Sequence, residues 1–392
     1  MPLQRPGRFG RALVSGIIVL GLSACRSFDG APRGELVIVG GGLDADNAEV
    51  IEAFVDGAGE RIVVLPTASG VPHESGPNAV EDLERHSDGG QSFDVLEVTI
   101  ATADRASSRV YVEVIEEAHA VWFTGGDQSR ITTVFRPRGI DTSAQDALER
   151  LLERGGRVAG SSAGAAIMSD PMISGGTSRD ALLHGRGERG FDLERGLGFF
   201  PYGIVDQHFL KRGRIGRLIV ALEESERALG FGIADDRALA VDLGTNTGRP
   251  LGERAVVVVD VAGMERDGRS RTDVRIALVS SGDTIDLETG AVAFADDKAE
   301  LLPLDLPYDA QFDRLDPFGE DTLTLLLERL SSDPSLPQRA SRGGIELVLS
   351  ADEHTRFAAR NGALEGFSAR GVRLDVLVDA SAGQPTSRRG RR

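Results

Sequence analysis

Short apolar runs alternate with longer amphipathic stretches through the first half of the chain. Runs rich in Val, Ile and Leu occupy residues 36–39 and 62–65, and residues 46–55 between them place apolar side chains at helical intervals. A similar run at 120–123 is apolar at every position, as in strands that are covered on both faces. This alternation predicts βαβ units with right-handed crossovers, and therefore an α/β fold with helices on both sides of a parallel sheet.

The pattern changes after Val241, where β-type segments follow one another. Residues 255–260 and 274–279 read as strands, residues 321–330 as a helix and residues 344–349 as another strand. No chemical motif is present there. We therefore expect a main domain over residues 35–295, a C-terminal extension of unknown role over 296–380, and a disordered tail over 381–392.

The N-terminus has the pattern of an export signal. Three arginines within the first eleven residues precede a short apolar segment at 12–22, too short for a comfortable membrane span. The sequence Leu22-Ser-Ala-Cys25 then resembles the bacterial lipoprotein box, which implies cleavage before Cys25 and lipid attachment to its thiol. Residues 1–24 would be the signal peptide and 25–34 a tether. The alternative is an ordinary signal peptide with a coincidental cysteine.

Composition narrows the classes of partner. The chain has 392 residues, a formal net charge of −17 and a single cysteine, so it can form no internal disulfide. A negative field repels phosphate backbones and anionic membranes, which argues against nucleic-acid binding and leaves lipidated Cys25 as the only expected membrane contact. No His/Cys/Asp cluster has zinc spacing, and we expect no metal or cofactor.

Several expected strands end in loops of small or turn-forming residues, at 40–42, 66–70, 124–128 and 160–164. Ligands of open α/β sheets bind at the carboxyl ends of strands, so these loops are expected to line one crevice. The loop Gly40-Gly-Gly42 lacks the spacing and the lysine of a phosphate loop. It is better explained by close backbone approach beside the active site than by nucleotide binding.

Ser162 is the candidate nucleophile. It lies in G-S-S-A-G (residues 160–164), between an expected short strand at 157–159 and an expected helix from Ala163 to Met168. Small neighbours permit the strained backbone of a nucleophile elbow, and the amide of Ala163 at the helix N-terminus can stabilise an oxyanion. An inert Gly/Ser turn is the alternative.

A serine hydroxyl needs a base to accept its proton. Of the six histidines, His208 is best placed, because it ends the strand-like run at 203–207. His354 would be the late base of a conventional α/β-hydrolase esterase, whose chain order is Ser, Asp/Glu, His.

Three motifs together resemble cyanophycinase of the peptidase S51 family. They are F-T-G-G-D-Q (123–128), G-S-S-A-G-A (160–165) and D-Q-H-F-L-K-R-G-R-I-G-R (206–217), in matching order and spacing. The resemblance covers about residues 35–287. It implies a parallel-sheet sandwich of the class I glutamine amidotransferase-like or flavodoxin-like type, Ser162 as nucleophile and His208 as general base. The family's third member is a glutamate; Asp235 stands at its place, with Asp236 as the reserve candidate.

The resemblance also implies an oxyanion amide from Gly126 or its neighbour Gly125, and a set of substrate-binding residues. That set is Gln128, Asp206, Gln207, Arg212, Arg214 and Arg217. Guanidinium groups suit it because they pair bidentately with carboxylates. Without the resemblance, Arg212 and Arg217 would be assigned to surface ion pairs with Glu223 and Glu226.

The resulting hypothesis is an exported, membrane-anchored serine-type exopeptidase of the bacterial envelope. It would hydrolyse β-aspartyl linkages through an acyl-enzyme, releasing β-aspartyl-arginine dipeptides from cyanophycin. An exported isoaspartyl dipeptidase with another substrate and a lipid-anchored binding protein without turnover remain alternatives. A homodimer is compatible with the sequence.

Overall fold

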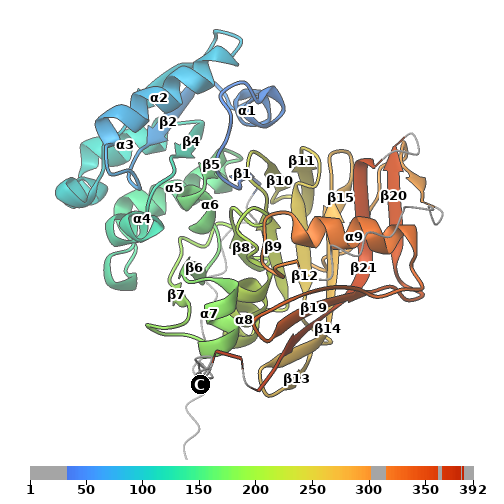
Figure 1. Cartoon of the computed structure of the whole chain (residues 1–392). Helices are drawn as coiled ribbons and strands as arrows, with labels where there is room; N and C mark the ends of the chain where they lie inside the picture. Colours follow the sequence, from blue (N-terminus) through green and yellow to red (C-terminus); the bar gives the residue numbers. More distant parts are fainter. Residues whose placement is uncertain (1–32, 302–314, 361–363, 381, 384–392) are drawn as a thin grey trace, which may run out of the picture.

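The computed structural model describes residues 33–301, 315–360, 364–380 and 382–383. The predicted signal peptide and Cys25 lie outside these residues, as does the predicted tail except for Ala382 and Gly383. Strand pairing in the described residues defines two large sheets and one two-stranded sheet, β6 (Met172–Gly175) with β7 (Asp192–Glu194) (Figure 1). No helix in this part of the chain is both long and apolar enough to span a bilayer.

The first sheet has nine strands in the order β16-β15-β11-β10-β1-β5-β4-β2-β3. Its parallel half is β1 (Glu35–Val39), β5 (Arg157–Ser161), β4 (Ala120–Phe123), β2 (Arg61–Leu65) and β3 (Ser92–Val95). Its antiparallel half is β10 (Ala238–Asp242), β11 (Thr247–Leu251), β15 (Thr284–Asp286) and β16 (Val292–Ala293). The apolar runs at 36–39, 62–65 and 120–123 are thus confirmed as parallel strands.

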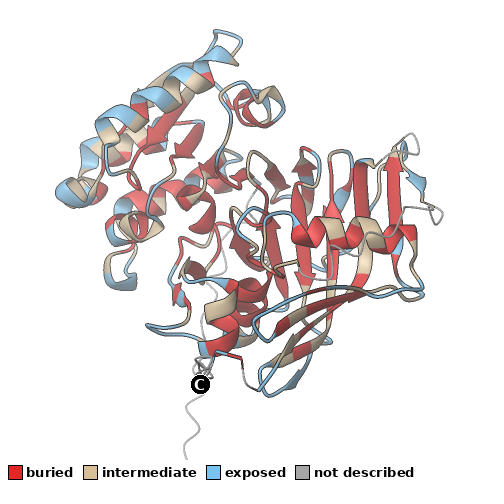
Figure 2. Ribbon diagram, viewed as in Figure 1, coloured by how far each residue is buried: buried red, intermediate tan, exposed pale blue. Residues whose placement is uncertain are grey.

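Helices cover both faces of the parallel half. On one face α1 (Ala48–Val55) and α2 (Pro72–Arg85) pack on Val37, Ile62 and Trp122. On the other face lie α3 (Arg109–Glu117), α4 (Gln128–Phe135) and α5 (Ser143–Glu153), with 3₁₀ turns η1 (Ile100–Ser107) and η2 (Pro137–Gly139). The outer face of α2 is exposed whereas the strands beneath it are buried (Figure 2). The predicted α/β class is confirmed.

The second sheet follows the order β17-β20-β21-β14-β12-β9-β8, with β13 beside β14 and the β18–β19 hairpin beside β21. Among the described strands of this sheet, only β8 (Ile204–Asp206) and β9 (Leu229–Ile233) pair in parallel. The antiparallel strands are β12 (Val256–Asp260), β13 (Glu265–Asp267), β14 (Ser270–Val279), β17 (Ala299–Glu300), β18 (Gln338–Arg342), β19 (Ile345–Ser350), β20 (Arg356–Arg360) and β21 (Glu365–Val378). The sandwich is therefore less parallel than expected, because hairpin turns replace helical crossovers after Val241.

The two sheets share one apolar core, in which Leu36 and Ile38 of β1 join the same buried cluster as Val256 and Val258 of β12. The opposite face of the second sheet packs on α7 (Ser178–His184), α8 (Ile215–Ser225) and α9 (Thr322–Ser332). Figure 1 shows α9 lying across this sheet.

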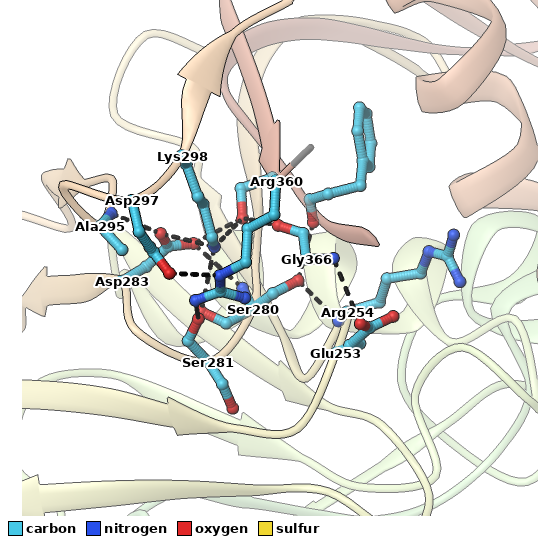
Figure 3. A network of polar contacts seen from close by, with 12 residues as sticks. Glu253, Arg254, Ser280, Ser281, Asp283, Ala295, Asp297, Lys298, Arg360 and Gly366 are labelled. Atoms are coloured by element: carbon cyan, nitrogen blue, oxygen red, sulfur yellow. Dashed lines mark hydrogen bonds and ion pairs between the residues drawn. The ribbon is translucent and has the colours of Figure 1, made fainter. Parts of the chain in front are cut away.

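The C-terminal segment is built into the second sheet. β21 pairs with β14 over most of its length, so strands from both sides of the boundary expected at residue 296 share one set of backbone hydrogen bonds. A polar network crosses the same boundary (Figure 3), in which Lys298 Nζ lies 2.7 Å from Asp283 Oδ1 and neither side chain is exposed. The expected helix at 321–330 and strand at 344–349 are confirmed as α9 and β19.

Candidate active site

Ser162 lies at a sharp turn between β5 and the short helix α6 (Ala163–Ala166), which is shorter than the helix expected to reach Met168. Its backbone is strained, with φ 55° and ψ −104°. The two flanking glycines are required by space: a Cβ atom on Gly160 would lie 2.5 Å from the Gly164 backbone, and one on Gly164 would lie 2.7 Å from the Phe123 carbonyl oxygen. The G-x-S-x-G string thus builds the expected nucleophile elbow.

His208 faces this serine from the end of β8. Its Nε2 lies 2.9 Å from Ser162 Oγ. Backbone hydrogen bonds hold it from both sheets, since its N–H donates to the Gly40 carbonyl and the next N–H, of Phe209, donates to Ile233. His354, by contrast, has a side chain that is 71% exposed and that lies beside Glu353. The esterase order with His354 as base is therefore excluded by the geometry.

Asp235 lies behind the imidazole, two residues after the end of β9. Its Oδ1 is 2.6 Å from His208 Nδ1. Its other oxygen, Oδ2, is buried and has no hydrogen-bond partner in the described part of the chain. Asp236 points elsewhere: its Oδ1 accepts from the Asp44 N–H and from Asn47 Nδ2. The structure thus brings Asp235, and not Asp236, to the histidine.

The glycine loop after β1 lies against the His208–Asp235 pair. A Cβ on Gly41, whose φ is +106°, would lie 2.3 Å from His208 Cε1, and one on Gly42 would lie 3.2 Å from Asp235 Oδ1. This loop therefore serves close backbone approach, as expected from its lack of a phosphate-loop pattern.

Burial lowers the pKa of His208, because the charged imidazolium loses water contacts. The hydrogen bond and the charge of Asp235 raise this pKa, and the guanidinium groups of Arg212 and Arg214 lower it. The net lowering of this pKa favours the neutral imidazole. With Nδ1–H donated to Asp235, Nε2 is free to accept a proton from Ser162.

Backbone amides suited to an oxyanion lie beside Ser162. The amide of Ala163 is the first of α6, whereas the amides of Ala165 and Ala166 already donate to the Ser162 carbonyl, so Ala163 is the amide suited to an oxyanion. The loop after β4 is also close, since a Cβ on Gly125 would lie 3.5 Å from Ser162 Cβ. Gly126 has φ +144° and packs against the Ala68 carbonyl, which joins this loop to the loop after β2.

Asp206 and Arg217, both expected to bind substrate, instead pair with each other. Arg217 Nε donates to Asp206 Oδ2 at 2.8 Å and its Nη2 donates to Oδ1, while the two side chains are only 4% and 1% exposed. Buried charges need such pairing. The pair is not available to a substrate as the structure stands. The alternative partner Glu223 is engaged by Arg266 and Arg271, so the surface pairing of Arg217 is also excluded.

The other expected substrate residues differ in exposure. Arg214 is buried, donates to the Gln207 carbonyl and to Asp206, and burial lowers its pKa to about 10. Gln207 is buried, and its Oε1 has no hydrogen-bond partner among the described residues. Gln128 donates from Nε2 to the Ile173 and Ser174 carbonyls, which anchors β6. Arg212 is exposed and forms no ion pair within the described residues.

Sequence reasoning missed Ser178, the first residue of α7. Its buried hydroxyl donates to the Gly213 carbonyl and accepts from the amides of Gly216 and Arg217, so it fixes the turn that carries the three arginines. Only its N-cap Thr177 could have marked this helix start in the sequence. No group of three or more metal-ligating side chains occurs in the part of the chain that the structure describes.

A strained serine at a strand-to-helix turn, a neutral histidine and a carboxylate in hydrogen-bonded series define the site of a serine hydrolase. The sequence profile of Peptidase family S51 matches residues 36–247, which contain all three side chains. The chain belongs to peptidase family S51 and is a serine-type peptidase.

Curated relatives agree with this assignment. The chain is 32% identical over 236 residues to a cyanophycinase of Nostoc sp. (strain PCC 7120 / SAG 25.82 / UTEX 2576), covering 59% of this chain and 74% of the relative. It is 29% identical over 273 residues to a cyanophycinase of Geminocystis herdmanii (strain PCC 6308), covering 66% and 95%. A solved peptidase from an acI-B1 Actinobacterium has a TM-score of 0.46 at 20% identity, covers 65% of this chain and 98% of that one, and is too distant to inform the site.

Proposed function

We propose that this protein hydrolyses amide bonds of β-aspartyl substrates, with cyanophycin as the preferred polymer and β-aspartyl-arginine dipeptides as products. The observation that carries the proposal is the series Ser162 Oγ, His208 Nε2 at 2.9 Å and His208 Nδ1 to Asp235 Oδ1 at 2.6 Å. The names of the relatives from Nostoc and Geminocystis support the substrate class.

In the proposed mechanism Ser162 Oγ attacks the substrate carbonyl carbon while His208 Nε2 takes the hydroxyl proton. Asp235 holds the imidazole and stabilises the imidazolium that forms. The oxyanion is stabilised by the amides of Ala163 and of Gly126 or Gly125. The imidazolium then protonates the leaving amine, and water, deprotonated by the same histidine, hydrolyses the acyl-enzyme and frees Ser162 Oγ–H.

Arg212 is the proposed direct contact for a substrate carboxylate, because it is the exposed member of the three arginines. Arg214, the Asp206–Arg217 pair and Gln128 support the walls of the site through the contacts described above. The Oε1 of Gln207 is buried and without a partner in the described residues, so it can accept a hydrogen bond from substrate only if this side chain becomes exposed. We further propose export and lipid attachment at Cys25, on the basis of residues 1–25.

The test is incubation of the protein with cyanophycin and, separately, with short isoaspartyl peptides, followed by mass analysis, with Ser162→Ala as control. Dipeptide release from the polymer by the wild type alone is the expected result. If the short peptides are cleaved but no dipeptide is released from the polymer, the substrate is another isoaspartyl compound and not cyanophycin. If neither is cleaved and Ser162 does not react with a serine-directed reagent, the protein is a binding protein.

A further inference from the structure

A turn of the C-terminal segment packs against the loop that follows His208. The turn at residues 316–319 packs against residues 209–217, which we call the arginine loop and which follow His208 directly. A Cβ on Gly213, where φ is +53°, would lie 2.3 Å from the Phe318 carbonyl oxygen. A Cβ on Gly216 would lie 3.2 Å from Cε1 of the Phe318 ring. Two glycines of the arginine loop thus leave room for one residue of the C-terminal segment.

The turn itself is fixed. The Phe318 N–H donates to Asp316 Oδ1 at 3.0 Å, and the Gly319 N–H and the Thr322 hydroxyl donate to the Asp316 carbonyl. Asp316 also pairs with Arg342 of β18 at 2.9 Å. Pro317 and Leu323 line a small apolar space with Phe209, Leu210 and Ile215 of the arginine loop. The turn at 316–319 is therefore held in place by its own hydrogen bonds and can support the arginine loop.

His208 and the later part of the arginine loop have different anchors outside the loop, although the Arg212 N–H donates to the His208 carbonyl and the Arg214 N–H to the Phe209 carbonyl. His208 is anchored by Gly40, by Gly41 and, through Phe209, by Ile233, all before the C-terminal segment. The later part of the loop, from Gly213 onward, rests on Ser178 and on Phe318. Arg214 is also held by the Gln207 carbonyl and by Asp206, so loosening Phe318 should move Arg212 and leave the Ser162–His208–Asp235 series in place.

We infer that Phe318 is a positioning residue of the C-terminal segment, which holds the arginine loop in the shape that binds the substrate carboxylate. The inference rests on the proposed function for the role of Arg212. It gives the segment after residue 296 a part in substrate binding, with no direct contact to the reacting atoms.

The test compares Phe318→Ala with the wild type on a β-aspartyl substrate. Phe318→Ala should raise KM about five-fold and change kcat by less than about two-fold, since binding but not chemistry is affected. Phe318→Leu should restore most of the affinity. In an Arg212→Ala background, Phe318→Ala should add no further rise in KM, because the two residues act through one contact. Leu336→Ala is the matched control, since it removes an apolar side chain of the same segment that is 55% exposed.

Hydrogen exchange of the arginine loop is measured on the same proteins and does not depend on substrate. Faster exchange at residues 210–214 in Phe318→Ala is expected. An unchanged KM, or a rise in KM that persists in the Arg212→Ala background, would overturn the inference. If the wild type cleaves no β-aspartyl substrate, the proposed function fails, and unchanged exchange alone then overturns the positioning role. Should Phe318→Ala not fold, Phe318→Val carries the same comparison with a smaller truncation.

Discussion

Two clusters in this molecule each combine a hydroxyl, a basic nitrogen and a carboxylate. One is Ser162 with His208 and Asp235. The other is Ser368 with Lys298 and Asp283, at the junction of the C-terminal segment; Figure 3 labels Lys298 and Asp283. Both are hydrogen-bonded throughout, and in both burial lowers the pKa of the basic group. Residue types and distances alone therefore do not distinguish the two clusters.

The two clusters differ in solvent exposure and in whether the basic nitrogen has hydrogen-bonding capacity left for a substrate. The side chains of His208 and Asp235 are 12% and 18% exposed, whereas those of Lys298 and Asp283 are fully buried. Lys298 Nζ meets three acceptors, namely Asp283 Oδ1, Ser368 Oγ and the Ser280 carbonyl. A lysine that donates all its protons into a closed site is not a base. The strained backbone of Ser162 and the His208 Nε2 that faces its hydroxyl distinguish the reactive cluster from one that only joins two segments.

The largest expected effect is on the reactive cluster. Asp235→Asn should lower kcat about 10⁴-fold, because an amide in place of the carboxylate favours the wrong imidazole tautomer. Steady-state kinetics on a β-aspartyl peptide measure it. Asp236→Asn is the matched control: it keeps Oδ1 as acceptor for Asn47 and should leave kcat near the wild-type value. Equal losses in the two variants would contradict the assignment of Asp235.

The buried cluster should respond in stability instead. Lys298→Met leaves the Asp283 charge without its ammonium partner and should lower the free energy of unfolding by about 3–5 kcal/mol. Urea denaturation measures it, and kcat per folded molecule should not change. Lys211→Met, at the chain's other lysine, is exposed and should change stability by less than about 0.5 kcal/mol. A loss of kcat in folded Lys298→Met would show that this cluster takes part in catalysis.

Substitution in the glycine loop beside His208 should also lower kcat. Gly41→Ala should lower kcat about 100-fold, since a Cβ there displaces the imidazole that must meet Ser162. Gly57→Ala is the control, because Gly57 also has positive φ, at +71°, but has no atom within 4 Å of its Cβ position. Similar activity of the two variants would mean that the close approach at Gly41 is not needed for the position of His208.

The smallest expected effect is a shift of the pH profile. The pKa of His208 is lowered from 6.5, so the acidic limb of kcat/KM should lie below pH 6.5, where the neutral base is lost as pH falls. Arg212→Gln removes a charge that lowers this pKa and should move the limb to higher pH, whereas Arg212→Lys should not. Arg212 is exposed, so added salt should reduce the difference. An unmoved limb at low salt would contradict the influence of Arg212 on His208.

The apolar and polar pattern of the sequence predicted those parts of the fold that depend on residues close together in the chain. The strands around β1, β2 and β4, the elbow at Ser162 and the delivery of His208 by β8 all follow from apolar runs ending in turns. The antiparallel pairing of the second sheet did not follow from these runs, because β14 and β21 pair residues that are 91 (Leu278 with Ala369) to 105 (Arg271 with Val376) positions apart. Apolar alternation does not specify a partner strand.

The candidate site shows the same division. Ser162 and His208 were expected from their turns, but the mutual pairing of Asp206 and Arg217 and the support of Gly213 by Ser178 and Phe318 depend on tertiary contacts. A motif such as R-G-R-I-G-R contains several cations without indicating which of them faces solvent. Burial decides that only Arg212 is exposed, since the charges of Arg214 and Arg217 are taken up by Asp206 and by backbone carbonyls.

Reaction with a fluorophosphonate, followed by site mapping, tests directly whether Ser162 is the nucleophile. One modified residue, Ser162, is expected by peptide mass analysis, with reaction lost in His208→Ala and retained in Lys298→Met. Modification of Ser368 or of Ser161 in place of Ser162, or reaction at an unchanged rate in His208→Ala, would contradict that assignment.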